Sequence, residues 1–283
     1  MWPLTSAAVL AWRLARKQGH IFLCEHTSLS NHVKQDLRTP LPLVQMLLRL
    51  SHTRATGVVA VSTGAAKDLA QLADLSEQHV AVIHNPVVSD QLPDTSQYPD
   101  PQVRSKLWGG CFRTHFVSVG TLKASKNFHL LLQSFAQVAF ELDAGLVILG
   151  EGSMRAAIEQ QVHDLGLQGR VVLPGFQADP SQWYCHADVF VLSSNFEGFA
   201  NVVAEALGCG TPVVSTSCPY GPAEILEYGR YGELVPVGDS AALASGMRRA
   251  IRRSWDRQTL QCRALDFSIP RQAQKYLDWF EAT

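Results

Sequence analysis

Short apolar runs alternate with amphipathic segments from Phe116 onward, and this alternation limits the possible folds more than any other feature of the sequence. Apolar residues in the amphipathic segments recur at spacings of three and four, which is typical of helices that cover a sheet. The expected strands are residues 116–120, 146–150, 171–174, 189–193, 212–216 and 233–236, and the expected helices are residues 127–140, 154–165, 201–207 and 241–251. The pattern predicts an α/β fold with a doubly wound parallel sheet.

The first hundred residues show the same alternation with fewer strands. Helices are expected at residues 7–17, 44–51 and 65–72, and strands at residues 21–24, 58–61 and 80–84. Because a mononucleotide-binding half normally has more strands than this, the N-terminal domain is expected to be an incomplete Rossmann-like domain.

Two segments of the chain are expected to join the domains. Residues 85–110 contain several prolines and a Gly-Gly pair with little apolar periodicity, so a linker is expected from about residue 85. The last segment predicts a docking helix with one side formed by Ala273, Tyr276, Leu277 and Phe280. The expected division is a partial N-terminal domain (1–108), a C-terminal domain (109–268) and a terminal helix (269–283) that packs back toward the first domain.

Charge and cysteine content argue against several classes of protein. Lys and Arg total 24 against 25 for Asp and Glu, so no net field draws the chain to nucleic acid. The six cysteines form no CxxC pair and no metal-ligand spacing, which indicates reduced thiols in a cytoplasmic protein with no metal site. The first apolar run has no positive charge before it, unlike a secretory signal, and no run approaches the roughly 18 residues that span a bilayer.

One expected helix carries four arginines opposite its apolar residues: Arg248, Arg249, Arg252 and Arg253. Such a face can contact anionic lipid, which leaves open a peripheral position at the inner face of the membrane. A solvated basic face is the favoured interpretation.

The strongest candidate site is Ser-Ser-Asn-Phe-Glu-Gly-Phe-Ala-Asn at residues 193–201, which ends a strand, turns and begins a helix. In a parallel sheet this is the carboxyl edge, where the unpaired N–H groups of the new helix suit a phosphate. Glu197 in the turn is expected near the phosphate, and Glu205 inside the helix can accept hydrogen bonds from sugar hydroxyls. Spacing alone leaves open that both are ordinary solvated acids.

A second strand, turn and helix start occupies residues 117–127. Lys126 is placed beside a helix N-terminus, where an ammonium and aligned N–H groups both offset negative charge on a leaving diphosphate. A surface lysine without function is the alternative.

Other turns narrow the chemistry. Residues 149–155 contain Gly-x-Gly after a strand, but Arg155 replaces the third glycine and no acid follows at the ribose spacing, which argues against hydride transfer. The turn at residues 219–224 starts another helix and is expected to line the same crevice. The chain has no Asp-x-Asp, which weakens a mechanism in which a metal bridges the diphosphate.

Together, residues 116–251 resemble the C-terminal domain of retaining glycosyltransferase family 4, which has the GT-B architecture of two Rossmann-like domains. The matching stretches are residues 119–120, 126–127, 149–152, 173–176, 187–192 and 221–225, with Glu197 and Glu205 between the last two. The first hundred residues match more weakly, at residues 21–27, 59–64 and 82–87. The resemblance implies a GT-B fold whose N-terminal domain is incomplete.

The resemblance also implies a role for each matching residue. Lys126 would bind the donor diphosphate, Glu197 the transferred sugar and Glu205 the ribose hydroxyls. Backbone at Gly198 and Phe199 would lie against sugar and phosphate, and the Gly175-Phe176 turn would contact the base. His26 would face the sugar across the cleft, although an ordinary histidine is the alternative there. The expected catalytic residues are thus Glu197, Lys126 and His26, and the expected donor-binding residues are Gly120, Thr121, Lys126, Gly175, Phe176, Gly198, Phe199, Ala200, Asn201 and Glu205.

The family resemblance implies a reaction without a metal, a cofactor or a covalent nucleophile, in which the leaving phosphate accepts the proton of the acceptor at the front face. The implied function is transfer of a hexose or N-acetylhexosamine, with a UDP-sugar favoured as donor, to a glycan or lipid-linked hydroxyl in cell-surface polysaccharide or glycolipid synthesis. The choice of sugar is prompted by the Cys-Pro-Tyr-Gly-Pro loop at residues 218–222, which resembles that of transferases serving such pathways.

Two departures from the family pattern matter. Thr121 stands where the family commonly has an arginine beside the diphosphate, so Lys123 or another cation would have to compensate. The opening strands of the acceptor domain, with the glycine-rich loop that closes over the donor, are not found in this sequence. A truncated, non-catalytic paralogue or fragment that still binds a nucleotide sugar is therefore the alternative function, and phosphoryl-ester or epimerase chemistry on the same architecture is a third.

Overall fold

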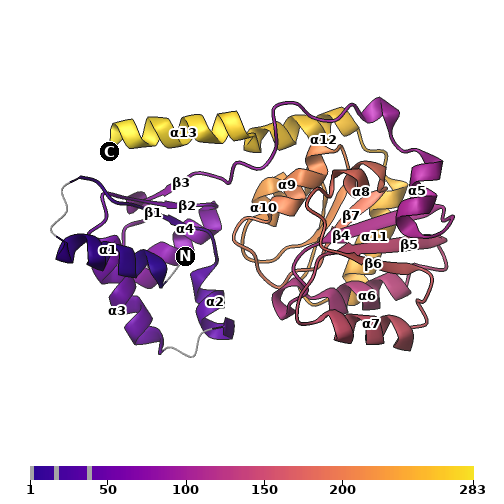
Figure 1. The fold of residues 1–283 in the computed structure, drawn as a ribbon, viewed down its shortest axis with the longest axis horizontal. Helices are drawn as coiled ribbons and strands as arrows, with labels where there is room; N and C mark the ends of the chain where they lie inside the picture. Colours follow the sequence, from indigo (N-terminus) through magenta and orange to yellow (C-terminus); the bar gives the residue numbers. More distant parts are fainter. Residues whose placement is uncertain (1–2, 16–18, 37–39) are drawn as a thin grey trace.

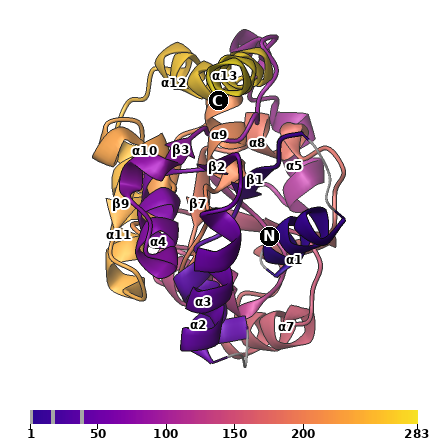
Figure 2. The ribbon, with the colours of Figure 1, turned by 90° about the vertical axis from the view of Figure 1, so that its left-hand side faces the viewer.

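The computed structural model describes residues 3–15, 19–36 and 40–283. Two α/β bodies lie side by side in Figure 1, and we name them the N-terminal half (residues 3–85) and the C-terminal half (residues 101–268). Figure 2 views the molecule from the side of the N-terminal half, with the last helix above it. Each half is built on a parallel sheet, so the predicted fold of two Rossmann-like α/β domains is confirmed.

The sheet of the C-terminal half has six parallel strands in the order β6-β5-β4-β7-β8-β9. All six predicted strands are present, with bounds at β4 Thr114–Val119, β5 Ala144–Leu149, β6 Val171–Gly175, β7 Val189–Leu192, β8 Val213–Thr216 and β9 Glu233–Val235. The chain order reverses between β4 and β7, and the crevice outside the carboxyl ends of such a strand pair is where doubly wound sheets bind ligands.

Helices cover both faces of this sheet, which explains why its strands are apolar throughout. Phe116 and Ile148 pack with α6, α7 and α11 on one face, and Val117 and Val147 pack with α5, α8, α9 and α12 on the other. The helices of this half are α5 Pro101–Trp108, α6 Phe128–Ala136, α7 Arg155–Asp164, α8 Ser181–His186, α9 Asn201–Gly208, α10 Pro222–Ile225, α11 Ser240–Arg252 and α12 Arg257–Ala264. The short helices α8 and α12 were not predicted.

The N-terminal half has three parallel strands in the order β1-β2-β3, so β1 forms one edge of the described sheet. Leu23, Val58 and Val80 of these strands pack with Leu48 and Leu69 of the helices. The elements are α1 Leu4–Leu14, β1 Phe22–Glu25, α2 Leu29–Asp36, α3 Leu41–His52, β2 Gly57–Ala60, α4 Thr63–Ala73 and β3 Val80–Val82. The helix α2 was not predicted. Single 3₁₀ turns in the chain lie at Glu77–His79, Thr95–Gln97, Ala124–Lys126, Glu227–Gly229 and Leu265–Phe267.

The expected linker at residues 85–110 contains a helix, α5, that belongs to the C-terminal half. Asp100 caps it by accepting hydrogen bonds from the N–H groups of Gln102 and Val103. Trp108 is fully buried and its indole N–H donates to the Phe116 carbonyl at 2.9 Å. The connection between the halves is therefore shorter than the sequence indicates. The helix was not predicted because a polar helix with a single buried residue shows no apolar periodicity.

The last helix, α13 Ile269–Ala282, leaves the C-terminal half and packs on β1 and β2 (Figure 1). The Trp279 ring occupies the space beside Gly57, where an added Cβ would lie 2.5 Å from the ring. The Phe280 ring lies 4.7 Å from that of Phe22. The predicted docking side is correct at Tyr276, which is partly buried, and at Phe280, whose ring contacts Phe22. It is wrong at Ala273 and Leu277, which are exposed. Gln272 and Trp279 turn inward instead.

Two segments cross between the halves next to each other. The Val87 N–H donates to the Phe267 carbonyl at 2.9 Å, and the Ile269 N–H donates to the Val88 carbonyl at 2.8 Å. Val88 and Ser268 form a parallel bridge. The outgoing and returning chains thus pair with each other where they pass from one half to the other.

Candidate functional site

An ion pair joins the turns that follow β4 and β7. The Lys126 ammonium donates to Glu197 Oε1 at 2.6 Å, and the Ser194 hydroxyl donates to the same oxygen at 2.6 Å. The Lys126 and Glu197 side chains are only 17% and 10% exposed. A positive and a negative group are therefore held together at the carboxyl edge of the sheet, where its strand order reverses.

Hydrogen bonds join the backbones of the same two turns. The Ser193 hydroxyl donates to the Lys126 carbonyl at 2.9 Å, and the Asn195 N–H donates to the Ser125 carbonyl at 2.8 Å. The Asn127 amide donates to Asn195 Oδ1 at 2.9 Å. Because these bonds fix each turn against the other, the position of Lys126 relative to Glu197 is set by the backbone as well as by the ion pair.

Residues 197–201 lead from Glu197 into α9. We name them the donor turn, after the role toward the sugar donor that the sequence predicts for them. Ala200 is in the left-handed region, with φ of 72°, and no side chain in the described part of the chain caps α9. The Val203 N–H donates back to the Ala200 carbonyl at 2.9 Å, so the first amides of α9 left for another partner are those of Asn201 and Val202, and such amides favour an anion. The Asn201 side chain accepts a hydrogen bond from Asn85, and the Phe199 ring is buried against His84 and Phe267.

Gly198 allows the N-terminal half to contact the donor turn. A Cβ at Gly198 would lie 2.0 Å from the carbonyl oxygen of His26, which follows β1. Only glycine fits so close an approach of two backbones. His26 itself is exposed, and its position next to Gly198 is compatible with its predicted role across the cleft, which stays a prediction.

A hollow of about 250 Å³ lies outside the ends of β4, β5 and β6. Gly150 at its floor has φ of 137°, and a Cβ there would lie 2.0 Å from the Gly120 carbonyl oxygen. The Phe176 ring is 73% exposed at the rim. The residues that line it are Val119, Gly120, Thr121, Leu149, Gly150, Glu151, Phe176 and Gln177, while Gly175 packs beneath against Glu151.

Glu205 lies apart from the Lys126–Glu197 pair. Its carboxylate accepts a hydrogen bond from the Tyr184 hydroxyl at 2.9 Å, and it lines a second hollow of about 320 Å³ together with residues 87–89, residues 91–93 and Ser181. Burial raises the pKa of the Glu205 carboxyl above its ordinary value, and the Tyr184 hydrogen bond offsets part of that rise. The structure therefore does not bring Glu205 into the hollow expected to hold it with Lys126 and Glu197, and its role toward the ribose stays a prediction.

Two family models match the sequence. The model described as Glycosyltransferase Family 4 matches residues 1–91, and the model described as Glycosyl transferases group 1 matches residues 113–253. The chain belongs to this glycosyltransferase family. The resemblance that residues 116–251 carry is thereby confirmed.

A solved structure shows the same architecture for this family 4 chain. HepE of Anabaena, crystallised in complex with UDP, matches with a TM-score of 0.82 at 23% sequence identity, covering 99% of this chain and 76% of that chain. The predicted GT-B fold is confirmed.

Relatives in sequence carry transferase names. A Campylobacter jejuni protein named N-acetylgalactosamine-N,N'-diacetylbacillosaminyl-diphospho-undecaprenol 4-alpha-N-acetylgalactosaminyltransferase is 28% identical over 240 residues, which is 82% of this chain and 63% of that protein. The lipopolysaccharide core biosynthesis glycosyltransferase LpsE of Rhizobium meliloti is 37% identical over 135 residues, which is 48% of this chain and 37% of LpsE. The family 4 chain thus spans less than two thirds of either relative.

Contacts between the halves involve residues that sequence reasoning did not assign to the site. The Ser62 hydroxyl donates to the Gly198 carbonyl at 2.7 Å. The Glu224 carboxylate accepts hydrogen bonds from Thr63 and from the His84 ring. The segments that contain these four residues match the family pattern. No local sequence signal identifies which residue contacts which, because these contacts depend on how the two halves dock.

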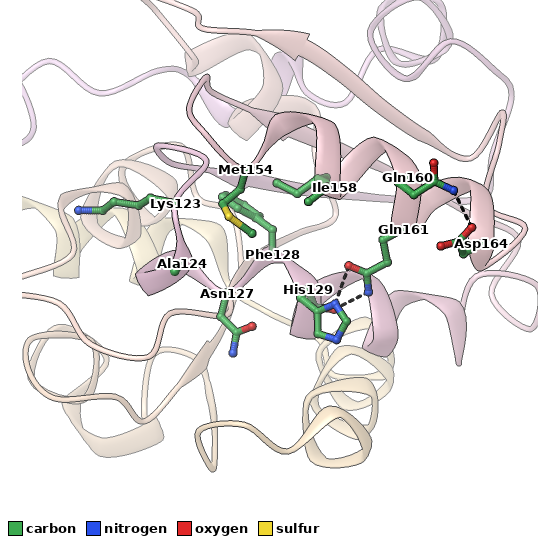
Figure 3. Close-up of a pocket in the computed structure, with 11 residues that line it drawn as sticks. Lys123, Ala124, Asn127, Phe128, His129, Met154, Ile158, Gln160, Gln161 and Asp164 are labelled. Carbon is green, nitrogen blue, oxygen red and sulfur yellow. Dashed lines mark hydrogen bonds between the residues drawn. The ribbon is translucent and has the colours of Figure 1, made fainter. Parts of the chain in front are cut away.

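A further hollow in the described part of the family 4 chain has no residue of the donor turn in its lining. It has a volume of about 500 Å³ and runs from the start of α6 along α7 as far as Asp164, over Phe128 and Ile158 (Figure 3). His129 and Gln161 hydrogen-bond across its wall at 2.8 Å. Neither Lys126 nor Glu197 lines this groove, so it is not the site that the sequence predicts.

The arginines of α11 are paired within the chain. Arg248 donates to Glu141 at 2.8 Å and Arg249 donates to Glu233 at 2.8 Å, while Arg252 and Arg253 lie within 4 Å of the same two acids. These pairs agree with the favoured interpretation of a solvated basic face, and they add that its arginines are neutralised by two acids. Among the described residues, no helix combines the length and the apolar character needed to cross a bilayer.

Proposed function

We propose that the chain binds a nucleoside-diphosphate sugar across the carboxyl ends of β4 and β7 and transfers the sugar to an acceptor hydroxyl with retention of configuration. The observation that carries this proposal is the Lys126–Glu197 pair at 2.6 Å, held beside the uncapped start of α9. One ammonium and the free amides of Asn201 and Val202 at one sheet edge suit a diphosphate, because both stabilise negative charge.

Each part of the donor has a chemically suitable neighbour. The diphosphate would lie on Lys126 and the amides of the donor turn, and the sugar would lie on Glu197, whose carboxylate accepts hydrogen bonds from hydroxyls. The base would lie in the hollow beside Gly175 and Phe176, where the exposed ring offers a flat apolar face. UDP is the favoured nucleotide because HepE, with the same fold, was crystallised with UDP.

The proposed reaction breaks the bond between the sugar C1 and the β-phosphate oxygen and forms a bond from C1 to the acceptor oxygen on the same face. The departing phosphate takes the proton of the acceptor hydroxyl, so no side chain needs to become covalently attached. Lys126 and the amides of the donor turn offset the negative charge that develops on the leaving diphosphate. With these groups in that role, and with no Asp-x-Asp in the sequence, we propose that the reaction needs no metal.

The acceptor is proposed to be a glycan or lipid-linked hydroxyl of cell-surface polysaccharide or glycolipid synthesis, and the transferred group a hexose or N-acetylhexosamine. The names of the relatives support this class, since one transfers to a diphospho-undecaprenol-linked sugar and another acts in lipopolysaccharide core synthesis. A lipid-linked acceptor would bring the chain to the inner face of the membrane.

A second candidate function is a non-catalytic module that binds the nucleotide sugar without turnover. The observation that favours it is the N-terminal half, whose described sheet has three strands and ends at β1. Such a sheet offers fewer loops for an acceptor, while the sheet of the C-terminal half has all six predicted strands.

The two functions are separated by measuring binding and turnover together. The purified chain is titrated with UDP, GDP and their sugars by calorimetry, and release of nucleoside diphosphate is followed with glycan and lipid acceptors present. Binding with release supports the transferase, and binding without release supports the module. Both candidate functions would be overturned if the wild type bound no nucleotide. They would also be overturned if the nucleotide affinity were unchanged in both single variants, Lys126→Ala and Glu197→Ala.

A further inference from the structure

Glu224 of the C-terminal half is a hydrogen-bond acceptor for the N-terminal half. Its Oε2 accepts from the Thr63 N–H at 3.0 Å, and its Oε1 accepts from the Thr63 hydroxyl at 2.9 Å and from His84 Nε2 at 2.7 Å. Charged acceptors make the stronger hydrogen bonds, so this carboxylate is a strong local link between the halves.

The backbone beneath Glu224 is fixed from the other side. The Arg263 guanidinium donates to the carbonyls of Glu224 and Ile225 at 2.8 and 2.9 Å. Next to it, the Tyr220 ring fills the space beside Gly64, where an added Cβ would lie 2.2 Å from the ring. The start of α4 is therefore held between Glu224 and Tyr220.

Thr63 is adjacent to the residue that reaches the donor turn. The fully buried Ser62 caps α4 by accepting from the Ala65 N–H at 3.2 Å, and its own hydroxyl donates to the Gly198 carbonyl at 2.7 Å. In a trans peptide the carbonyl and the next N–H point in opposite directions. Because the Gly198 carbonyl is fixed toward Ser62, the Phe199 N–H of the same peptide is fixed in the opposite direction, away from the N-terminal half.

We propose that Glu224 is a positioning residue for donor binding: by holding Thr63, it holds Ser62 on the Gly198 carbonyl and so orients the amides of the donor turn. The inference rests on the proposed function, because it assumes that the donor turn holds the diphosphate. It adds that docking of the halves and binding of the nucleotide are coupled through one carboxylate.

The test compares four variants of the full chain with the wild type. Glu224→Ala removes all three contacts, Glu224→Gln keeps one carbonyl oxygen for the Thr63 hydroxyl and His84, and Thr63→Val removes only the hydroxyl contact. Glu233→Ala is the matched control, since Glu233 is a partly buried carboxylate paired with arginines of its own half. The measurements are UDP affinity by calorimetry, amide hydrogen exchange over residues 197–202, and the radius of gyration from X-ray scattering.

We expect Glu224→Ala to weaken UDP binding by about fivefold or more, at the low end of couplings between sites, and to speed amide exchange in the donor turn. Glu224→Gln and Thr63→Val should show smaller effects of the same kind, and Glu233→Ala none. The radius of gyration should rise in Glu224→Ala.

Two results would overturn the inference. A lower melting temperature in Glu224→Ala with unchanged UDP affinity and unchanged exchange over residues 197–202 would show a merely structural contact. If the wild type binds no UDP, the proposed function fails, and the exchange and scattering data still decide whether Glu224 holds the donor turn.

Discussion

Gly198→Ala would place a methyl group inside the contact between the two halves. The added Cβ would lie 2.0 Å from the His26 carbonyl oxygen, 2.8 Å from its carbonyl carbon and 3.0 Å from Thr27 Cα. All three are backbone atoms, so no change of rotamer relieves the clash. The segment after β1 must retreat by about 1 Å before the shortest distance reaches 3.0 Å.

Overpacking of this kind costs about 1–3 kcal/mol. For a chain of this size each kcal/mol corresponds to about 2–4 °C in Tm, so we expect a fall of about 2–12 °C. We also expect weaker UDP binding, because the retreat pulls Ser62 away from the Gly198 carbonyl. Thermal unfolding with and without UDP measures both effects.

Gly166→Ala is the control for the general cost of replacing a glycine. Gly166 has φ of 66° with no atom within 4 Å of an added Cβ, so alanine there should cost about 1 kcal/mol of backbone strain and leave UDP affinity unchanged. Wild-type Tm and wild-type UDP affinity in Gly198→Ala would refute the contact between His26 and the donor turn.

Three further predictions concern charge and metal. Lys126→Ala should lower the rate of nucleoside diphosphate release by about a hundredfold, because one group that stabilises the developing anion is lost. Lys123→Ala, at an exposed lysine of the same turn, should change this rate little. Equal losses in the two variants would show that Lys123 shares the role of Lys126. Burial alone would raise the pKa of Glu224, but hydrogen bonds from His84 and Thr63 outweigh it and hold the pKa below its usual value of 4.5. A carboxyl with a lowered pKa stabilises the fold above its unfolded pKa and loses this contribution as the pH falls through its folded pKa. The Tm difference between wild type and Glu224→Ala should therefore shrink in acid, and a difference that does not shrink would contradict this. Excess EDTA should leave transfer unchanged, and a loss that Mg²⁺ or Mn²⁺ restores would refute the metal-free mechanism.

Much of the C-terminal half follows from local pattern. Its strands are buried on both faces, so they appear as short apolar runs, and the turns after them appear as glycine-containing breaks. Lys126 and Glu197 could each be expected near one diphosphate because turns after parallel strands lie at the same edge of the sheet, but their ion pair was not predicted. The helix α5 could not, because only Trp108 of its residues is buried.

Contacts between distant segments were not predictable in the same way. Periodicity predicts that residues 270–283 form a helix, but the side that docks is chosen by the space that Gly57 leaves for Trp279. Likewise, Glu224 looks like an ordinary helix acid until Thr63 and His84 are placed opposite it. The Tyr184 hydroxyl on Glu205 has no sequence signal at all, since it depends on α8 packing beside α9.

The paired crossing at Val88 and Ser268 limits how this molecule can open. A single connecting segment lets two domains bend and twist in any direction. Two connecting segments that hydrogen-bond to each other resist twisting, so the remaining motion is bending about the line that joins them. Any opening of the halves should therefore be a rotation about that line, with the smallest displacement beside Phe267 and the largest in the parts of the two halves that lie farthest from it.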